Sequence, residues 1–277
     1  MFRAGRFEFP LGKKTYVMGI LNYTPDSFSD GGENFSPEAA LKAALEMQSQ
    51  GADIIDIGAN STRPGAEILS ASQELERLTP ALEAICGKVD AAISVDTFYP
   101  LCAEAALKAG ASIINDVSGE FNREMALLCK KYGAGYIVVH NPCGAGVAAE
   151  YENSVVTAVR NFFVDALQLA AEIGLPKEQI CLDTGFGFSK KYEDNIELLA
   201  NMEWLKFKGV ALLSASSRKR FIGTACGEEN PKMRDAGTVA ANTAAIAGGA
   251  DIIRVHDVYS AVQGARVADA IFRRNNG

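Results

Sequence analysis

Residues 37–58 read PEAALKAALEMQSQGADIIDIG and form one complete unit of helix, stop and strand. The first part is rich in Ala, Leu, Glu and Lys, which favour helix, and Ser36 with Pro37 supplies an N-cap followed by proline at the first helical position. Gly51 ends the run at the place where a left-handed C-cap favours glycine. The short β-branched run at 53–58 is typical of a buried parallel strand.

The same alternation continues along the chain and predicts a strand at each of 16–22, 53–58, 92–96, 112–116, 135–140, 179–183, 209–214 and 251–256. Further helix stops are expected at Gly87, Gly110, Gly133 and Gly174. Eight strands separated by helices predict a single-domain (β/α)8 TIM barrel over residues 1–277, with an open doubly wound sheet as the structural alternative.

Three local features refine this prediction. Ser70 to Gln73 fits a capping box at the start of the second helix. Pro80 falls inside that helix and is expected to kink it or to shift its start. Residues 5–13 are expected to form a hairpin across the barrel floor.

Composition restricts the classes of partner. The formal charge of −7 and the pI near 5.1 disfavour nucleic acid and anionic membrane surfaces. No stretch approaches the roughly 20 apolar residues of a membrane span, and no secretory leader is evident at the N-terminus. The six cysteines include no CxxC pair, which indicates reduced thiols and argues against a structural zinc site. We therefore expect a cytoplasmic protein that binds small molecules.

Polar residues recur where the predicted strands end, at positions that a packed strand would not favour. They are Asn22, Asp56, Asp96, Asn115, His140, Asp183, Lys219, Arg254 and His256. One such residue alone is usually a helix cap or a satisfied loop group. Together they predict convergence at the barrel mouth, where enzymes of this fold place their chemistry.

The last strand carries the most distinctive pair. Arg254 and His256 are two residues apart and so project to one side, whereas Asp257 projects to the other and is expected to cap the next helix. We interpret Arg254 and His256 as an anion clamp. The alternative is that neighbouring carboxylates satisfy both side chains.

The other strand-end residues suit a flat ligand. Asp96, Asn115 and Asp183 offer hydrogen-bonding groups for a heterocycle with an amino-pyrimidinone edge, and Lys219 adds a donor. A metal cluster is the competing use of the carboxylates, but no two acids have a recognised ligand spacing. Asn22 indicates at most a Mg²⁺ ion held jointly with substrate phosphates.

Two polar loops, TPDSFSDGG (24–32) and STRPG (61–65), follow the first two strands. They are long enough to close over a ligand, and Asp30 and Arg63 could pair when they do so. The alternative is that both loops are simple connections.

Several segments resemble motifs of dihydropteroate synthases, in the order in which that family has them. They are MGILNYTPDSFSDGG (18–32), GADIIDIGANSTRPG (51–65), SVDT (94–97), INDVSG (114–119), DTGFGFSK (183–190), SRKRFIG (217–223) and RVHDV (254–258). The resemblance spans residues 16 to 270. It implies condensation of 6-hydroxymethyl-7,8-dihydropterin diphosphate with p-aminobenzoate in folate biosynthesis, with release of pyrophosphate through a pterin cation, and a homodimer that sulfonamides target.

The resemblance also implies residue roles. The pterin would contact Asp96, Asn115, Asp183 and Lys219. Asn22, Arg63, Arg254 and His256 would hold the diphosphate, with Asn22 also contacting Mg²⁺. The p-aminobenzoate pocket would contain Thr62, Pro64, Phe188, Lys219 and Arg220. Catalytic roles would fall to Asp96, Asp30, Arg63 and Lys219.

Some positions depart from the family pattern. Arg220 stands where the family has serine beside the p-aminobenzoate carboxylate, and it could bind that carboxylate more strongly or crowd it. Thr184, Ala215 and the segment VVHNPCG also differ. The departures leave two alternatives open: a pterin-dependent methyltransferase of the same superfamily, or a catalytically silent pterin-binding paralogue.

Overall fold

The computed structural model describes residues 1–24, 36–60, 68–143 and 147–273. Eight parallel strands close into a barrel in the order β10-β3-β4-β5-β6-β7-β8-β9. Their bounds are β3 Tyr16–Asn22, β4 Ile54–Gly58, β5 Ala92–Asp96, β6 Ile113–Asp116, β7 Gly135–Val139, β8 Ile180–Asp183, β9 Ala211–Ser214 and β10 Ile252–Val255. The barrel confirms the predicted fold and excludes the open doubly wound sheet.

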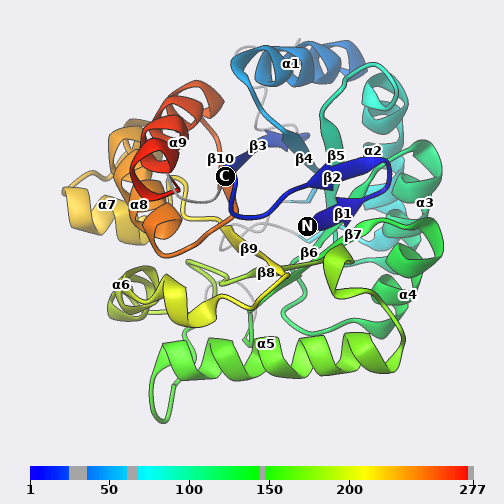
Figure 1. Ribbon diagram of the computed structural model, residues 1–277. Coiled ribbons are helices and arrows are strands. Elements are labelled where there is room, and N and C mark those ends of the chain that lie inside the picture. The colour runs from blue at the N-terminus through cyan, green and yellow to red at the C-terminus, as the bar shows by residue number, and fades with distance from the viewer. Residues whose placement is uncertain (25–35, 61–67, 144–146, 274–277) are drawn as a thin grey trace.

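Helices surround the barrel as an outer ring (Figure 1). They are α1 Pro37–Gln50, α2 Ala71–Ile85, α3 Pro100–Ala109, α4 Arg123–Tyr132, α5 Val155–Glu172, α6 Tyr192–Ala200, α7 Arg220–Cys226, α8 Asp235–Ala247 and α9 Val258–Phe272, with short 3₁₀ turns η2 Lys177–Gln179, η3 Met202–Leu205 and η4 Pro231–Met233. None of the helices within the described ranges is long and apolar enough to cross a membrane.

The helix ends follow the local sequence signals. Ser36 accepts a hydrogen bond from the amide of Ala39, and the capping box at Ser70 is formed as predicted. Gly51, Gly110 and Gly133 directly follow their helices in the left-handed conformation, whereas Gly87 and Gly174 adopt it two residues after the last residue of α2 and of α5.

Pro80 lies inside α2 without moving the start of that helix. Of the two predicted effects, a kink or a shifted start, the shifted start does not occur. The capping box fixes the beginning of α2 at Ala71. Proline lacks a backbone N–H and so removes only one backbone hydrogen bond from the helix, which is stabilised by packing of its buried face.

The N-terminal hairpin begins earlier than predicted. Its strands are β1 Phe2–Ala4 and β2 Phe7–Phe9, joined by a turn in which Gly5 has a φ of 59°. Phe2 and Phe9 are buried beside Tyr16, which starts β3, so the hairpin covers the amino-terminal end of the barrel (Figure 1). The predicted range of 5–13 was wrong because the alternation of buried and exposed residues that defines these strands starts at Phe2.

Alternate strand residues fill the barrel interior, as the period of two requires. Below the mouth this inner layer is apolar and includes Met18, Ile54, Ala92, Ile113, Ile137, Cys181, Leu213 and Ile252. Two residues further along β4, β5, β6, β8 and β10, the inward positions become polar. The change from apolar to polar at one level of the barrel is what creates a candidate site.

The carboxyl-terminal helix is tied to the opposite end of the barrel. Asp269 of α9 accepts hydrogen bonds of 2.7 Å from both the amide and the hydroxyl of Thr15, just before β3.

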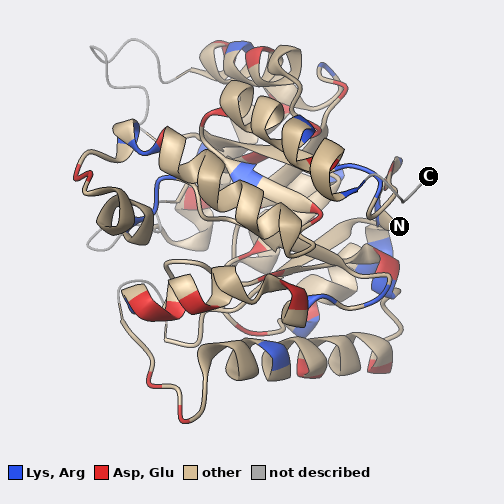
Figure 2. Cartoon of the chain, turned by 60° about the vertical axis from the view of Figure 1, so that its left-hand side comes forward, with Lys and Arg blue, Asp and Glu red and all other residues tan. Residues whose placement is uncertain are grey.

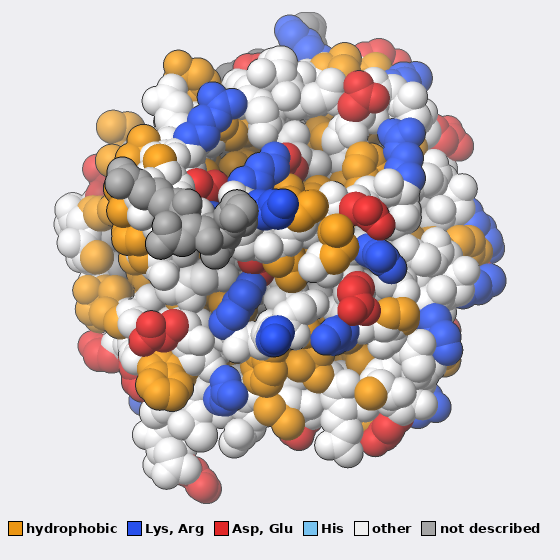
Figure 3. Space-filling view, in the orientation of Figure 1, with side chains coloured by type: hydrophobic (Ala, Val, Ile, Leu, Met, Phe, Trp, Pro, Cys, Tyr) orange, Lys and Arg blue, Asp and Glu red, His pale blue; other side chains and the backbone are white. Residues whose placement is uncertain are grey.

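Acidic and basic side chains are interspersed on the face where the hairpin lies (Figure 3).

Candidate functional site

A buried charge cluster occupies the barrel mouth at the carboxyl ends of four strands. Arg254 of β10 donates from Nε to Asp56 Oδ2 of β4 at 2.6 Å and from Nη2 to Asp96 Oδ2 of β5 at 2.8 Å. Asn115 of β6 donates from Nδ2 to the same Asp56 oxygen at 3.0 Å. Figure 2 shows that charged residues occur on strands inside the ring of helices as well as on its surface.

The cluster leaves hydrogen-bond acceptors unused. Asp56 is fully buried, and its Oδ1 has no partner among the described residues; the same holds for Asn115 Oδ1. A buried acceptor without a donor costs about 1–3 kcal/mol. The mouth is therefore arranged for a ligand that brings its own N–H groups.

Opposing electrostatic effects set the pKa of Asp96. Burial raises the pKa of its carboxyl group, Arg254 lowers it and the like charge of Asp56 raises it, with a net pKa of about 7. The side chain retains 14% of its exposure, so a ligand at the mouth can reach it. Asp96 can thus accept hydrogen bonds as a carboxylate or change its protonation when a ligand binds.

Asp183 and Lys219 line the mouth from β8 and from the start of α7. Asp183 is buried and accepts from the amide of Gly185 at 2.8 Å; burial raises the pKa of its carboxyl group, and Lys219 opposes that rise. The ammonium of Lys219 donates to the carbonyl of Phe186 and lies 4.3 Å from the ring centroid of Phe188. Burial lowers the pKa of Lys219 to about 8.

The contacts of Arg254 and His256 support the predicted anion clamp only in part. Carboxylates hold two nitrogens of Arg254, as the alternative interpretation expected, but its Nη1 has no partner among the described residues. His256 lies beyond the end of β10 with Nδ1 3.0 Å from Ser217 Oγ. Asp257 caps α9 by accepting from the amide of Ser260, as predicted.

Asn22 is the last residue of β3, partly buried, and its side chain has no hydrogen-bond partner among the described residues. The described part of the chain contains no group of three His, Cys, Asp or Glu side chains that could hold a metal ion. One amide oxygen fits Mg²⁺ only when ligand oxygens and water complete its coordination.

Four predicted site residues, Asp30, Thr62, Arg63 and Pro64, lie outside the described residues. Of the others in the predicted p-aminobenzoate pocket, Phe188 is partly buried, and Arg220 is exposed as the first residue of α7.

Comparisons with known proteins agree with this geometry. A family model described as pterin binding enzyme matches residues 18–256. A dihydropteroate synthase of Synechocystis sp. is 46% identical over 97% of this chain and 94% of its own length. The chain belongs to the dihydropteroate synthase family.

Solved structures of the family have the same fold. The dihydropteroate synthase of Clostridium difficile, determined in the presence of pteroic acid, matches with a TM-score of 0.89 at 42% identity, covering 96% of this chain and all of that one. The Yersinia pestis enzyme, solved as a sulfonamide drug complex, matches with a TM-score of 0.87 at 35% identity over 97% of each chain.

In this member of the synthase family, sequence reasoning placed one residue wrongly. His140 follows β7, but its ring packs 5.2 Å from that of Phe162 on α5, so it does not join the cluster at the mouth. The reason is parity: Ile137 and Val139 face the barrel interior, and the next residue faces the helices.

One strand-end residue was given no specific role from the sequence, and another residue of the region was missed. Asp56, a carboxylate within an otherwise apolar strand, was expected at the mouth, and it links Arg254 to Asn115. Lys190 donates to several atoms behind Asp183, and no sequence signal beyond its place in the DTGFGFSK motif indicated this.

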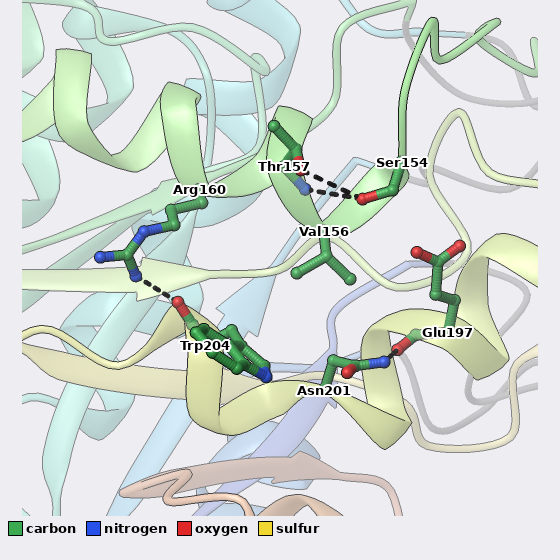
Figure 4. A pocket seen from close by; sticks show the side chains of 7 residues that line it. All are labelled: Ser154, Val156, Thr157, Arg160, Glu197, Asn201 and Trp204. Atoms are coloured by element: carbon green, nitrogen blue, oxygen red, sulfur yellow. Dashed lines mark hydrogen bonds between the residues drawn. The ribbon is translucent and has the colours of Figure 1, made fainter.

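A surface cleft on the outer helical layer is separate from the polar residues at the strand ends. That cleft, of about 290 Å³, lies between α5 and the α6–η3 segment and is lined by Thr157, Arg160, Asn201 and Trp204 among others (Figure 4). Within the cleft, Arg160 donates a hydrogen bond to the carbonyl of Trp204. The cleft contains none of the strand-end polar residues, so we assign the functional site to the barrel mouth.

The balance of charges around Asp96 can be tested by removing its acidic neighbour. In Asp56→Asn, the like charge that raises the pKa of Asp96 is lost and Arg254 keeps only one carboxylate, so that pKa is expected to fall by at least about one pH unit. Carboxyl ¹³C NMR titration measures it. The exposed Asp90→Asn serves as control, and an unchanged or higher pKa for Asp96 would contradict the described coupling.

Proposed function

We propose that this protein is a dihydropteroate synthase that joins 6-hydroxymethyl-7,8-dihydropterin diphosphate to p-aminobenzoate, giving 7,8-dihydropteroate and pyrophosphate. The observation that carries the proposal is the pair of unused buried acceptors on Asp56 and Asn115, beside the partly exposed Asp96 and the guanidinium of Arg254. This arrangement matches the N–H donors of a pterin edge next to a diphosphate. Curated relatives named for this activity are 40–46% identical over nearly the whole chain.

The pterin ring would lie across the inner polar layer. Asp96 and Asp183 would accept from ring and amino N–H groups, and Asn115 can both donate and accept. Lys219 would donate to a ring acceptor, and its lowered pKa of about 8 keeps most of it charged at pH 7. Because Asp96, Asn115 and Asp183 are fixed by strands, they lose little freedom when the ligand binds.

The bond that breaks joins the pterin methylene carbon to the diphosphate oxygen. Its electron pair leaves with pyrophosphate, and the positive charge spreads over the pterin ring. The aryl amine then adds to the methylene carbon and loses a proton. Asp56, Asp96 and Asp183 favour the transient cation electrostatically, and Arg254 Nη1 and His256 face the leaving anion in this scheme.

A Mg²⁺ ion fits this scheme through Asn22 and the diphosphate oxygens. Such an ion would neutralise charge on the leaving group. A lone amide ligand makes the ion dependent on substrate, so we propose that metal and diphosphate bind together.

We also propose the homodimer that the resemblance implies. Helix α9 exposes apolar side chains at Tyr259, Val267 and Ile271, which gives a second copy an apolar surface to cover. Sulfonamide binding at the p-aminobenzoate pocket is proposed on the same family grounds.

The reaction itself can be tested with purified protein, both substrates and Mg²⁺. Pyrophosphate release that requires p-aminobenzoate, with dihydropteroate identified by mass, is expected. Loss of the charged acceptor in Asp96→Ala removes a contact worth about 1.5–3 kcal/mol and the field that favours the cation, so kcat/KM should fall at least about a hundredfold. Near-normal turnover would exclude the proposed role of Asp96. Pterin binding without product would favour the silent paralogue, and methyl transfer to a corrinoid protein would favour the methyltransferase.

Arg220 is proposed to bind the carboxylate of p-aminobenzoate. It is exposed, and its guanidinium has no ion-pair partner among the described residues, so it can turn toward an anion. Arg220→Ser should raise the KM for p-aminobenzoate about tenfold and leave the KM for the pterin diphosphate unchanged. Steady-state kinetics measure both constants, with the exposed Lys232→Ser as control. A lower KM in Arg220→Ser would show that arginine crowds the pocket.

A further inference from the structure

The ammonium group of Lys190 lies at the centre of a ring of acceptors behind the barrel mouth. Its Nζ is 3.0 Å from the carbonyl oxygens of Gly185 and Phe188, 3.1 Å from that of His140, and 3.0 Å from His140 Nδ1. Four acceptors thus share three ammonium protons. Such convergence is unusual for a lysine, whose charge normally stays hydrated at the surface.

The atoms that Lys190 contacts come from two segments that must stay in register. The carbonyl of His140 ends β7, whereas those of Gly185 and Phe188 belong to the loop that follows Asp183. The two backbones approach very closely, since a Cβ on Gly185, whose φ is 65°, would lie 2.0 Å from the His140 carbonyl oxygen. Lys190 fills the remaining space and supplies donors to carbonyls that no strand ladder can satisfy.

This loop carries two residues of the proposed site. Asp183 stands at its start and accepts from the amide of Gly185, whose carbonyl binds Lys190. Phe188 contacts the ammonium of Lys219 through its ring and the ammonium of Lys190 through its carbonyl. The position of both side chains relative to the mouth therefore depends on the same cation.

The charged groups around Lys190 do not form a simple ion pair. Asp183 at the end of β8 and Asp194 on α6 attract it, and Lys219 at the start of α7 repels it. From β7, His140 faces it as a neutral ring, because burial and the nearby lysine lower the pKa of that imidazole to about 3. Tyr151, before α5, lies against the same ring. The neutral ring accepts through Nδ1, so Lys190 is held by dipoles and not by a contacting carboxylate.

We propose that Lys190 is a positioning residue for the synthase reaction: its ammonium ties the loop after β8 to the end of β7 and so places Asp183 and Phe188 at the mouth. The proposal rests on the proposed function for its catalytic consequence. The adjacent Lys191 has a different environment, because it is exposed and pairs with Glu150 on the surface.

The role has a pH dependence of defined sign. Burial lowers the pKa of Lys190 to about 7. A pKa below the usual value of lysine means that the docked loop holds the neutral amine more readily than the ammonium, so raising the pH through 7 favours the docked loop. The contribution of Lys190 is therefore smallest in acid and increases as the pH rises through 7.

The test compares Lys190→Met with Lys191→Met at a series of pH values from 6 to 9. At pH 9, kcat/KM of Lys190→Met should be at least tenfold below wild type, and this deficit should be at least threefold smaller at pH 6. Titration of the substrates cancels in that ratio. Lys191→Met should stay within twofold of wild type throughout. A ratio that does not change with pH, or a value near one at pH 9, would overturn the proposal.

A second readout separates this proposal from the proposed function. Amide hydrogen exchange at residues 184–190, measured at pH 8 on the whole protein, should be at least tenfold faster in Lys190→Met than in Lys191→Met. Exchange that is equal in the two variants overturns the positioning role even if the enzyme is active. If wild type makes no dihydropteroate but the loop exchanges faster, the proposed function fails and the structural role of Lys190 stands. Should Lys190→Met not fold, Lys190→Gln, which keeps two N–H donors, replaces it in both measurements with the same criteria.

Discussion

Arg254 binds carboxylates from two neighbouring strands, and this contact fixes the polar layer at the barrel mouth. Asp56 can be fully buried because the guanidinium of Arg254 and the side-chain amide of Asn115 both donate to it. Buried charges are tolerated only when paired in this manner. The pairing is incomplete, since one oxygen of Asp56 and one nitrogen of the Arg254 guanidinium have no partner among the residues that the structure describes. A structure optimised only for stability would favour apolar residues here, so the incompleteness identifies a place where a ligand completes the network.

The proposed chemistry needs both signs of charge within a few ångströms. A departing diphosphate is favoured by cations, and the pterin cation left behind is favoured by carboxylates. The barrel separates the two by strand, with acids on β4, β5 and β8 and the guanidinium on β10. Because the surroundings are buried, each of these charges acts over a lower effective dielectric than water would give. The site therefore works by fixed electrostatics and needs no strong nucleophile.

The fold was predictable because its signals are local. Gly51, Gly110 and Gly133 end helices where left-handed residues are needed, and the capping box at Ser70 fixes the start of α2 although Pro80 lies inside that helix. The inward residues of the site followed from strand parity. Parity also explains the error at His140, since the sequence does not show where β7 ends relative to its inward positions. The hairpin was misplaced because three-residue strands give too short a pattern to locate.

What the sequence could not give is the contact between distant segments. Lys190 meets the end of β7 across 50 positions of sequence, and Arg254 meets Asp56 across 198. Neither partner is implied by spacing or residue type. The individual roles of Asn22, Arg220 and His256 likewise remain predictions from family resemblance and from their places at the mouth.

The most direct measurement is a crystal structure of the protein with 6-hydroxymethyl-7,8-dihydropterin diphosphate and Mg²⁺. The account predicts the pterin ring within hydrogen-bond distance of Asp96, Asn115 and Asp183, with the diphosphate beside Arg254 and His256. A pterin bound elsewhere, for example in the cleft between α5 and η3, with the contacts of Arg254 unchanged, would contradict it.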